Sequence, residues 1–230
     1  MKKMAIQDII FDMDGVLTDS EWFIAEAACR MFQENHGVPV RHEDFLPFVG
    51  LGENRFLGGV AEQYGVANFN LDRDKKKTYD IYLKLIAGNL KPLPGAVEFV
   101  LHCKEQGLKI AMATSTDYIK MMANLREIGL ADGVFDALVN GLDVERKKPF
   151  PDIFLEAARR LKVEPELCWV IEDSIGGVQA AKAAGMFCCA LLTSFPEAAL
   201  REAGADLIVP NLSVLRISDL EDFHKTTLQK

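Results

Sequence analysis

The sequence predicts an α/β protein in which a parallel sheet is covered by helices on both faces and a separate α-helical segment is inserted. Three observations predict this fold class. Short apolar runs alternate with amphipathic segments over most of the chain, several of those segments end at a glycine, and one long N-terminal stretch holds only helical patterns. Strands buried on both faces occur as unbroken apolar runs, and strands that alternate with helices are typical of a parallel sheet.

The first expected strand covers residues 6–11. Unbroken apolar runs predict five more strands, at residues 108–114, 137–139, 168–171, 187–192 and 207–209. Amphipathic segments predict the helices between them, at residues 95–106, 118–129, 151–161, 175–184 and 196–203. Four glycines follow helices of this set, as expected of a residue that ends a helix in the left-handed conformation: Gly107, Gly129, Gly185 and Gly204.

The stretch from residue 20 to residue 89 interrupts this alternation. Its patterns are helical, at residues 21–36, 56–64 and 72–87, and none resembles a strand. Connections are expected at residues 18–20 and 90–95, where "LKPLPG" supplies the prolines and the glycine of a linker. We therefore predict a core domain of residues 1–18 and 93–230 and a helical domain of residues 19–92.

Composition excludes several classes of protein. The chain has 230 residues, 49% of them apolar, and a net charge of −8, with its lysines and arginines scattered, so no nucleic-acid-binding face is expected. The N-terminal apolar runs are too short for a signal peptide or a membrane span, which makes a cytoplasmic protein the expectation. Five cysteines without C-x-x-C spacing predict buried free thiols, and four histidines without ligand spacing predict surface or structural roles.

Polar side chains follow several of the predicted strands. Asp12 and Asp14 follow the first strand, Thr114 and Ser115 the second, and the pair Glu172–Asp173 a later one. A loop also carries Lys148. Because ligands of parallel α/β sheets bind beyond the carboxyl ends of the strands, these groups are expected to converge on one crevice.

The chemistry of such a set is narrow. Clustered carboxylates repel one another unless a cation is present, and Mg²⁺ prefers oxygen ligands. Hydroxyls and a lysine would neutralise the remaining oxygens of a phosphate, which predicts a phosphoryl-transfer site. In the D-x-D pair, one carboxylate can attack phosphorus while the other protonates the leaving oxygen and later deprotonates water.

Four segments carry a resemblance to a known family. "FDMDGVLTDS", "MATST", "KKPFPDIFLEAA" and "IEDSIGGVQAAKAAGM" resemble the four motifs of the haloacid dehalogenase superfamily, in the subfamily with a helical cap after the first motif. The sequence is most similar to the β-phosphoglucomutase-like group of sugar-phosphate phosphatases and mutases. The resemblance implies a Rossmannoid core with a helical cap and catalysis through an aspartyl-phosphate.

The resemblance also implies roles for single residues. Asp12 matches the nucleophile and Asp14 the general acid/base. Thr114, with Ser115 beside it, matches the phosphate-binding hydroxyl, and Lys148 matches the lysine of the third motif. The implied ligands of Mg²⁺ are the Asp12 side chain, the Asp14 backbone carbonyl and Asp173. Glu172 would either bind the ion directly or contact the residues that bind it.

Two departures bear on the reaction. In β-phosphoglucomutase-like mutases the cap carries a histidine and an arginine, and these positions fall on Ile24 and Glu53. Hydrolysis is therefore favoured over mutase activity, and Asp14 argues against a dehalogenase. A non-catalytic phospho-acceptor module is the third alternative, although it would need neither Asp14 nor a large cap.

The glycine-rich stretch "FVGLGENRFLGG", residues 48–59, is the other informative segment of the predicted cap. Asn54 and Arg55 are expected to bind a sugar hydroxyl or a second phosphate, as Glu53 also could. The alternative is a plain turn between two helices. The sequence as a whole thus predicts a Mg²⁺-dependent, monomeric phosphatase that acts on a small phosphorylated metabolite such as a sugar phosphate.

Overall fold

The protein contains a six-stranded parallel sheet with the strand order β3-β2-β1-β4-β5-β6. The computed structural model describes residues 8–130 and 133–227. The strands are β1 (Asp8–Phe11), β2 (Lys109–Ala113), β3 (Ala137–Val139), β4 (Cys168–Glu172), β5 (Phe187–Leu191) and β6 (Leu207–Val209). The predicted fold class is confirmed, and residues 6 and 7 of the first predicted strand lie outside the described residues.

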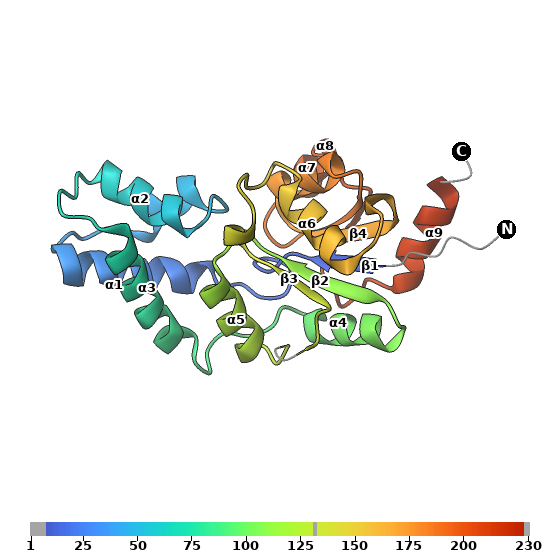
Figure 1. Ribbon diagram of the computed structural model, residues 1–230, viewed down its shortest axis with the longest axis horizontal. Coiled ribbons are helices and arrows are strands. Elements are labelled where there is room, and N and C mark those ends of the chain that lie inside the picture. The colour runs from blue at the N-terminus through green and yellow to red at the C-terminus, as the bar shows by residue number, and fades with distance from the viewer. Residues whose placement is uncertain (1–7, 131–132, 228–230) are drawn as a thin grey trace.

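Helices cover both faces of this sheet (Figure 1). One face carries α4 (Ala96–Glu105) and α5 (Tyr118–Glu127), and the other carries α6 (Asp152–Leu161), α7 (Ile175–Ala183) and α8 (Glu197–Glu202). Strand β1 is buried on both sides, with Ile9 and Phe11 facing α4 and α5 and Ile10 facing α6 and α7. This two-sided burial explains why the strands occur in the sequence as unbroken apolar runs.

Four helices of the core are followed by a glycine, and one further helix lies near the C-terminus. Gly107, Gly129, Gly185 and Gly204 have φ values of 78°, 78°, 77° and 104°, which confirms that these glycines adopt the left-handed conformation after a helix. The C-terminal helix α9 (Ile217–Thr227) was not predicted. Its Leu220 is buried in the same hydrophobic core as Phe11 and Trp169.

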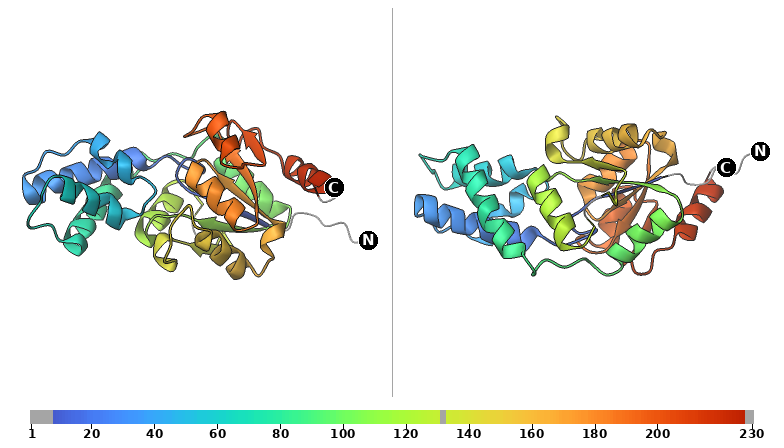
Figure 2. Two further views of the ribbon diagram at one scale, coloured as in Figure 1. Left: turned by 90° about the horizontal axis from the view of Figure 1, so that it is seen from above. Right: turned by 60° about the horizontal axis from the view of Figure 1, so that its bottom comes forward.

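Residues 19–92 are described throughout and form no strand. They contain α1 (Glu21–His36), the short 3₁₀ helix η1 (His42–Phe48), α2 (Glu53–Gln63) and α3 (Leu71–Ile86). Helices α1 and α3 pack together around buried side chains that include Phe32 and Tyr82. All three ribbon views place these helices together on one side of the sheet domain (Figures 1 and 2).

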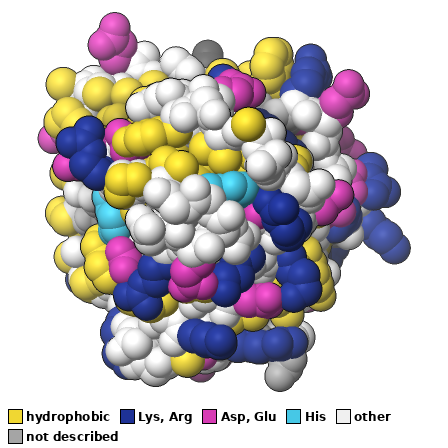
Figure 3. Space-filling view, turned by 90° about the vertical axis from the view of Figure 1, so that its left-hand side faces the viewer, with side chains coloured by type: hydrophobic (Ala, Val, Ile, Leu, Met, Phe, Trp, Pro, Cys, Tyr) yellow, Lys and Arg dark blue, Asp and Glu magenta, His cyan; other side chains and the backbone are white. Residues whose placement is uncertain are grey.

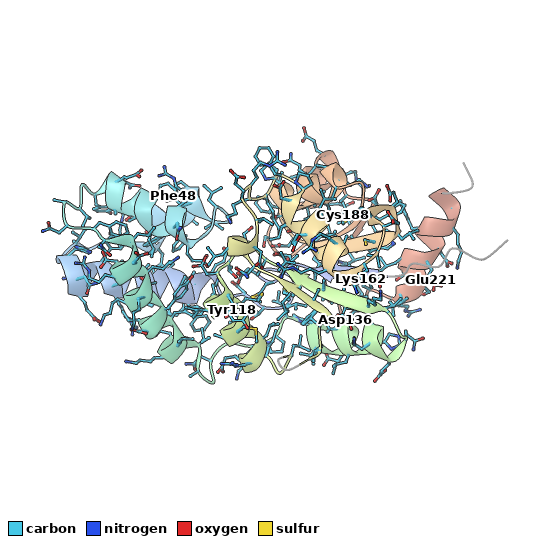
Figure 4. All side chains as sticks on the ribbon, in the orientation of Figure 1. Phe48, Tyr118, Asp136, Lys162, Cys188 and Glu221 are labelled. Carbon is cyan, nitrogen blue, oxygen red and sulfur yellow. The ribbon has the colours of Figure 1, made fainter. Side chains whose placement is uncertain are left out.

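Two chain segments connect these helices to the sheet and run side by side. The Leu93 amide donates to the Leu17 carbonyl at 2.9 Å, and the Thr18 hydroxyl donates to the Lys91 carbonyl at 2.8 Å. Helix α3 also packs on α5, the helix that begins at the labelled Tyr118 in Figure 4. The helical segment therefore packs on the helix that follows β2.

The cysteines, the histidines and the surface charges were predicted from composition. All five cysteines are free thiols as expected, and four are buried, whereas Cys29 is partly exposed. His36 pairs with the buried Asp74 across α1 and α3, with 3.0 Å between Nε2 and Oδ2. Figure 3 shows basic, acidic and apolar side chains interspersed on the face formed by α1–α3. Among the described residues, no helix is both long enough and apolar enough to cross a membrane.

Candidate active site

The carboxyl ends of three adjacent strands form the site. Phe11 of β1 lies beside Met112 of β2 and Ile171 of β4 in the parallel register. The residues that follow, among them Asp12 and Thr114, therefore meet at one edge of the sheet. Strand order reverses here, because the chain runs from β1 out to β3 and then returns to β4 on the other side of β1. Parallel sheets bind ligands at such a switch point.

An acidic cluster lies at this edge. Carboxylate oxygens of Asp12, Glu172 and Asp173 come within 4.8 Å of one another. All three residues are buried, with exposed fractions of 7%, 0% and 5%. The Lys148 ammonium is 2.7 Å from Asp12 Oδ1 and also contacts Glu172 Oε1. The predicted convergence of these four side chains is therefore observed.

The cluster carries a buried excess of negative charge. Burial raises the pKa of Asp12 to about 7, with Glu172 and Asp14 adding to the shift and Lys148 opposing it. Burial likewise raises the pKa of Asp173, and Glu172 and Asp12 add to it. Burial alone would lower the pKa of Lys148, but the attraction of Asp12 and Glu172 is larger, so the lysine stays charged. One lysine thus faces three carboxylates, which favours an added cation.

Glu172 is held rigidly by the start of α7. Its Oε2 accepts hydrogen bonds from the Asp173 amide at 2.8 Å, the Ser174 amide at 2.7 Å and the Ser174 hydroxyl at 2.9 Å. Gly177 packs against the same carboxylate, where a β-carbon would lie 1.9 Å from Glu172 Cδ. The glycine therefore makes room for the acid.

Asp173 is confined by two neighbours. Gly15 has φ of +78°, and a β-carbon there would lie 1.9 Å from Asp173 Oδ2. The Ser194 hydroxyl donates to the same oxygen, and Thr193 beside it donates to the Gly15 carbonyl at 2.6 Å. The loop after β5 thus helps to orient a carboxylate of the acidic cluster.

Asp14 points away from the cluster, toward α5 and the first connection. Its Oδ1 accepts hydrogen bonds from the Ser20 amide at 3.2 Å and from the Ser20 hydroxyl, and its Oδ2 lies 2.8 Å from the Lys120 ammonium. Asp12 and Asp14 therefore have different partners, as two carboxylates with separate tasks require.

The hydroxyl groups after β2 differ in their bonding. Thr114 Oγ1 accepts a hydrogen bond from the Thr116 amide at 3.3 Å. Among the described residues, the buried Ser115 hydroxyl makes no hydrogen bond to protein. A buried hydroxyl without a partner is uncommon and is suited to binding a ligand.

The helical segment contributes polar contacts above the strand ends. Glu53 Oε2 accepts the Asp117 amide at 3.1 Å, and Lys75 Nζ lies 2.7 Å from Asp117 Oδ2 and 2.8 Å from Asn54 Oδ1. Burial raises the pKa of Glu53 to about 7, with Asp117 and Asp14 adding to the shift and Lys120 opposing it. Asp117 thus contacts both α2 and α3.

Arg55 makes its contacts within the helical segment, and its role in binding substrate stays a prediction. Its side chain is 51% exposed, pairs with Glu62 at 2.8 Å and stacks over Phe48 with 5.2 Å from Cζ to the ring centroid. Asn54 accepts a hydrogen bond from Lys75, the lysine that pairs with Asp117 of the core. The two neighbours diverge because successive helical residues point about 100° apart.

Sequence reasoning missed Lys120, Ser20, Lys75 and Ser194. A signal existed for the first of these. Helix α5 buries a stripe in which Lys120 and Asn124 alternate with Met121 and Leu125. A lysine on a buried stripe needs a charged partner, and the nearest carboxylate motif in the sequence is the D-x-D pair.

The parallel sheet and its acidic cluster, with a lysine between carboxylates at the switch point, define a hydrolase of the Rossmannoid α/β class. The chain belongs to the haloacid dehalogenase-like hydrolases, because the family model matches residues 7–185. The resemblance inferred from the four motifs is thereby confirmed.

Two individual relatives show which named proteins the chain resembles. The chain is 46% identical over 220 residues to protein SUPPRESSOR OF QUENCHING 1, chloroplastic, from Arabidopsis thaliana, where the match covers 94% of this chain and 20% of that protein. It is 34% identical over 214 residues to the phosphorylated carbohydrates phosphatase of Thermotoga maritima, covering 92% of this chain and 98% of the relative. Relatives named as phosphatases support the predicted class of enzyme, whereas the cytoplasmic location stays a prediction.

A solved structure supports the same fold. CbbY from Rhodobacter sphaeroides in complex with phosphate superimposes with a TM-score of 0.80 at 27% identity. The match covers 91% of this chain and 96% of that one. Both the sheet and the helical segment of this chain therefore have counterparts in a solved member of the family.

Proposed function

We propose that this protein is a Mg²⁺-dependent phosphatase that hydrolyses a small phosphorylated metabolite, such as a sugar phosphate, through an aspartyl-phosphate. One observation carries the proposal. Asp12 lies at the carboxyl end of β1, 2.7 Å from the buried Lys148 and within the acidic cluster. The relative from Thermotoga maritima that is named as a phosphatase of phosphorylated carbohydrates supports the substrate class.

The side chains of the cluster fit a magnesium ion. Oxygen ligands on a buried, negatively charged edge are what Mg²⁺ selects. The Asp12 and Asp173 carboxylates and the Asp14 backbone carbonyl would hold it. Both Glu172 oxygens already accept hydrogen bonds, which favours a role in fixing Lys148 and the start of α7. When bound, the ion would offset the charge of the carboxylates and of the phosphate oxygens.

The residues then divide the reaction between them. Asp12 attacks phosphorus, and the bond to the leaving oxygen breaks while Asp14 supplies the proton that this oxygen takes up. Lys148, Thr114 and Ser115 bind the phosphate oxygens during transfer. Asp14, now a carboxylate, removes a proton from the water that attacks the aspartyl-phosphate. Inorganic phosphate leaves and Asp12 is regenerated.

We further propose that residues 19–92 act as a cap over this site, with residues 1–18 and 93–230 as the core. The paired connections at Leu17–Leu93 and Thr18–Lys91 give the two units a common hinge region. Contacts of Glu53 and Lys75 with Asp117 hold the cap against the residues that follow the phosphate-binding hydroxyls. A closed cap excludes bulk water from the aspartyl-phosphate.

Hydrolysis is favoured over mutase activity by two residues of the cap. A mutase must bind the second phosphate of a bisphosphate, and the mutases of this group do so with a histidine and an arginine of the cap. The two positions concerned carry Ile24 and Glu53, both buried, and Glu53 is an acid. Water is therefore the proposed final acceptor.

The test is release of inorganic phosphate from a panel of sugar phosphates, sugar bisphosphates and nucleotides, with Mg²⁺ and with EDTA. We expect metal-dependent release from one or a few monophosphates. Protein with Asp12→Asn serves as the control for contaminating phosphatases. Conversion of a hexose 1-phosphate to its 6-phosphate without net release would instead indicate a mutase, and release that persists in EDTA would contradict the metal requirement.

A further inference from the structure

Asp14 is bound by donors from two different elements. Ser20, at the start of α1, gives Oδ1 an amide hydrogen bond and a hydroxyl hydrogen bond. Lys120, in the first turns of α5, lies 2.8 Å from Oδ2. Each oxygen thus has its own donors, so the carboxylate cannot turn without breaking a contact.

Lys120 is unusually placed for a lysine. The residue is 3% exposed, and within the part of the chain that the structure describes its ammonium donates its one hydrogen bond to Asp14. Burying an ammonium is costly unless it is paired, and a pair of this kind constrains both partners. The rest of the catalytic proposal makes no use of this lysine.

Two further buried groups hold Ser20, the other partner of Asp14. Asn124, one turn after Lys120 on α5, donates through Nδ2 to the Ser20 hydroxyl at 3.1 Å. Tyr82 of α3 donates its hydroxyl to Asn124 Oδ1 at 2.5 Å. Ser20, Asn124 and Tyr82 are all fully buried. One face of α5 therefore positions Asp14 directly through Lys120 and indirectly through Asn124.

We propose that Lys120 is a positioning residue for Asp14: its ammonium fixes the carboxylate that handles the proton of the leaving group and of the attacking water. The inference rests on the proposed function, because it assigns Lys120 a task in the same reaction. Helix α5 follows the loop that carries Thr114 and Ser115, so the element that begins at the phosphate-binding hydroxyls also fixes the acid.

The consequence depends on the leaving group. Without the ammonium, Asp14 keeps its contacts to Ser20 but loses the contact that sets the direction of Oδ2. A misplacement of about 1 Å in a catalytic group can cost about 100-fold in rate. An alkyl phosphate needs the acid to leave, whereas p-nitrophenolate leaves without one. The loss should therefore fall on the alkyl substrate and spare the first step with p-nitrophenyl phosphate.

The experiment compares Lys120→Met with Lys120→Arg, which keeps a cationic donor. Lys182→Met is the matched control, because Lys182 forms a pair with Asp206, 2.5 Å apart, at the other edge of the sheet. For each variant we would measure kcat and KM for the sugar phosphate identified above, and the pre-steady-state burst of p-nitrophenol. We expect Lys120→Met to lower kcat for the sugar phosphate by about 10- to 100-fold with little change in KM. The burst rate should change less than threefold, and Lys120→Arg should recover part of kcat.

A double variant tests whether the effect passes through Asp14. If Lys120 acts by positioning, Lys120→Met adds nothing to the loss caused by Asp14→Asn. Independent losses that multiply, or equal losses on both substrates, would overturn the inference. Ser20→Ala provides a second test if Lys120→Met does not fold, and it should show the same leaving-group pattern in weaker form. Wild-type protein without phosphatase activity would refute the proposed function, whereas an active wild type matched by Lys120→Met would refute only the role of Lys120.

Discussion

Gly177→Ala should disable the acidic cluster although Gly177 itself has no catalytic group. A β-carbon at this position would lie 1.9 Å from Cδ and Oε1 of Glu172 and 2.3 Å from Oε2. Ordinary contacts are about 3.5–4 Å, so the carboxylate or the first turn of α7 must shift by roughly 1.5 Å. Glu172 is fully buried, so the carboxylate cannot move into solvent without a larger shift of its surroundings.

The cost can be worked from the contacts of Glu172. Its Oε2 accepts three hydrogen bonds, and its Oε1 contacts Lys148. Each hydrogen bond to a charged group contributes about 1.5–3 kcal/mol. Weakening one or two of them should lower the free energy of unfolding by about 2–4 kcal/mol. Replacing glycine by alanine in a helix offsets up to about 1 kcal/mol of this loss. Lys148 should also shift, with a loss of roughly 100-fold in activity.

The neighbouring residue provides the control. A β-carbon at Gly176 meets only Lys148 Cβ, at 3.9 Å, an ordinary contact. Gly176→Ala should therefore be neutral or stabilising by up to about 1 kcal/mol. The assay is urea unfolding followed by circular dichroism, with Mg²⁺ affinity measured by calorimetry. Equal stability and equal Mg²⁺ affinity in the two alanine variants would refute the close packing of α7 on Glu172.

Three further predictions address the separate roles of the carboxylates. Asp12→Asn should abolish turnover while the circular dichroism spectrum stays native, and retained turnover would exclude Asp12 as the nucleophile. Asp14→Asn should lower turnover of an alkyl phosphate by about 100-fold or more but slow the p-nitrophenol burst far less, as measured by stopped flow; equal losses would argue against an acid role. Glu53 has a folded pKa raised from 4.5 to about 7, so its contribution to stability declines as pH rises through that window. The free energy of unfolding of Glu53→Gln, relative to that of the wild type, should therefore rise by up to about 3 kcal/mol between pH 5 and pH 8, as measured by urea unfolding. A difference that does not change with pH would contradict the raised pKa.

The sequence by itself determined the six strands and the helices between them, and it predicted which polar side chains meet at the strand ends. Strands buried on both faces require unbroken apolar runs, so all six were visible as local patterns. The glycines after four helices were equally local, because a positive φ selects for glycine. Asp12, Asp14, Lys148 and Asp173 were identifiable because strand ends of a parallel sheet meet at one edge, so that position along the chain already implied position in space.

Only the tertiary structure decided which side chains from distant segments touch. Lys120 and Asp14 are 106 positions apart, and Lys75 and Asp117 are 42 apart, so no periodic pattern links either pair. The packing of α3 on α5 brings Lys75 to Asp117. The position of α5 beside the loop after β1 brings Lys120 to Asp14, whereas Arg55 is left half-exposed on α2 beside Glu62. Local patterns record which face of an element is buried, but the identity of the partner on that face depends on how the helices pack in three dimensions.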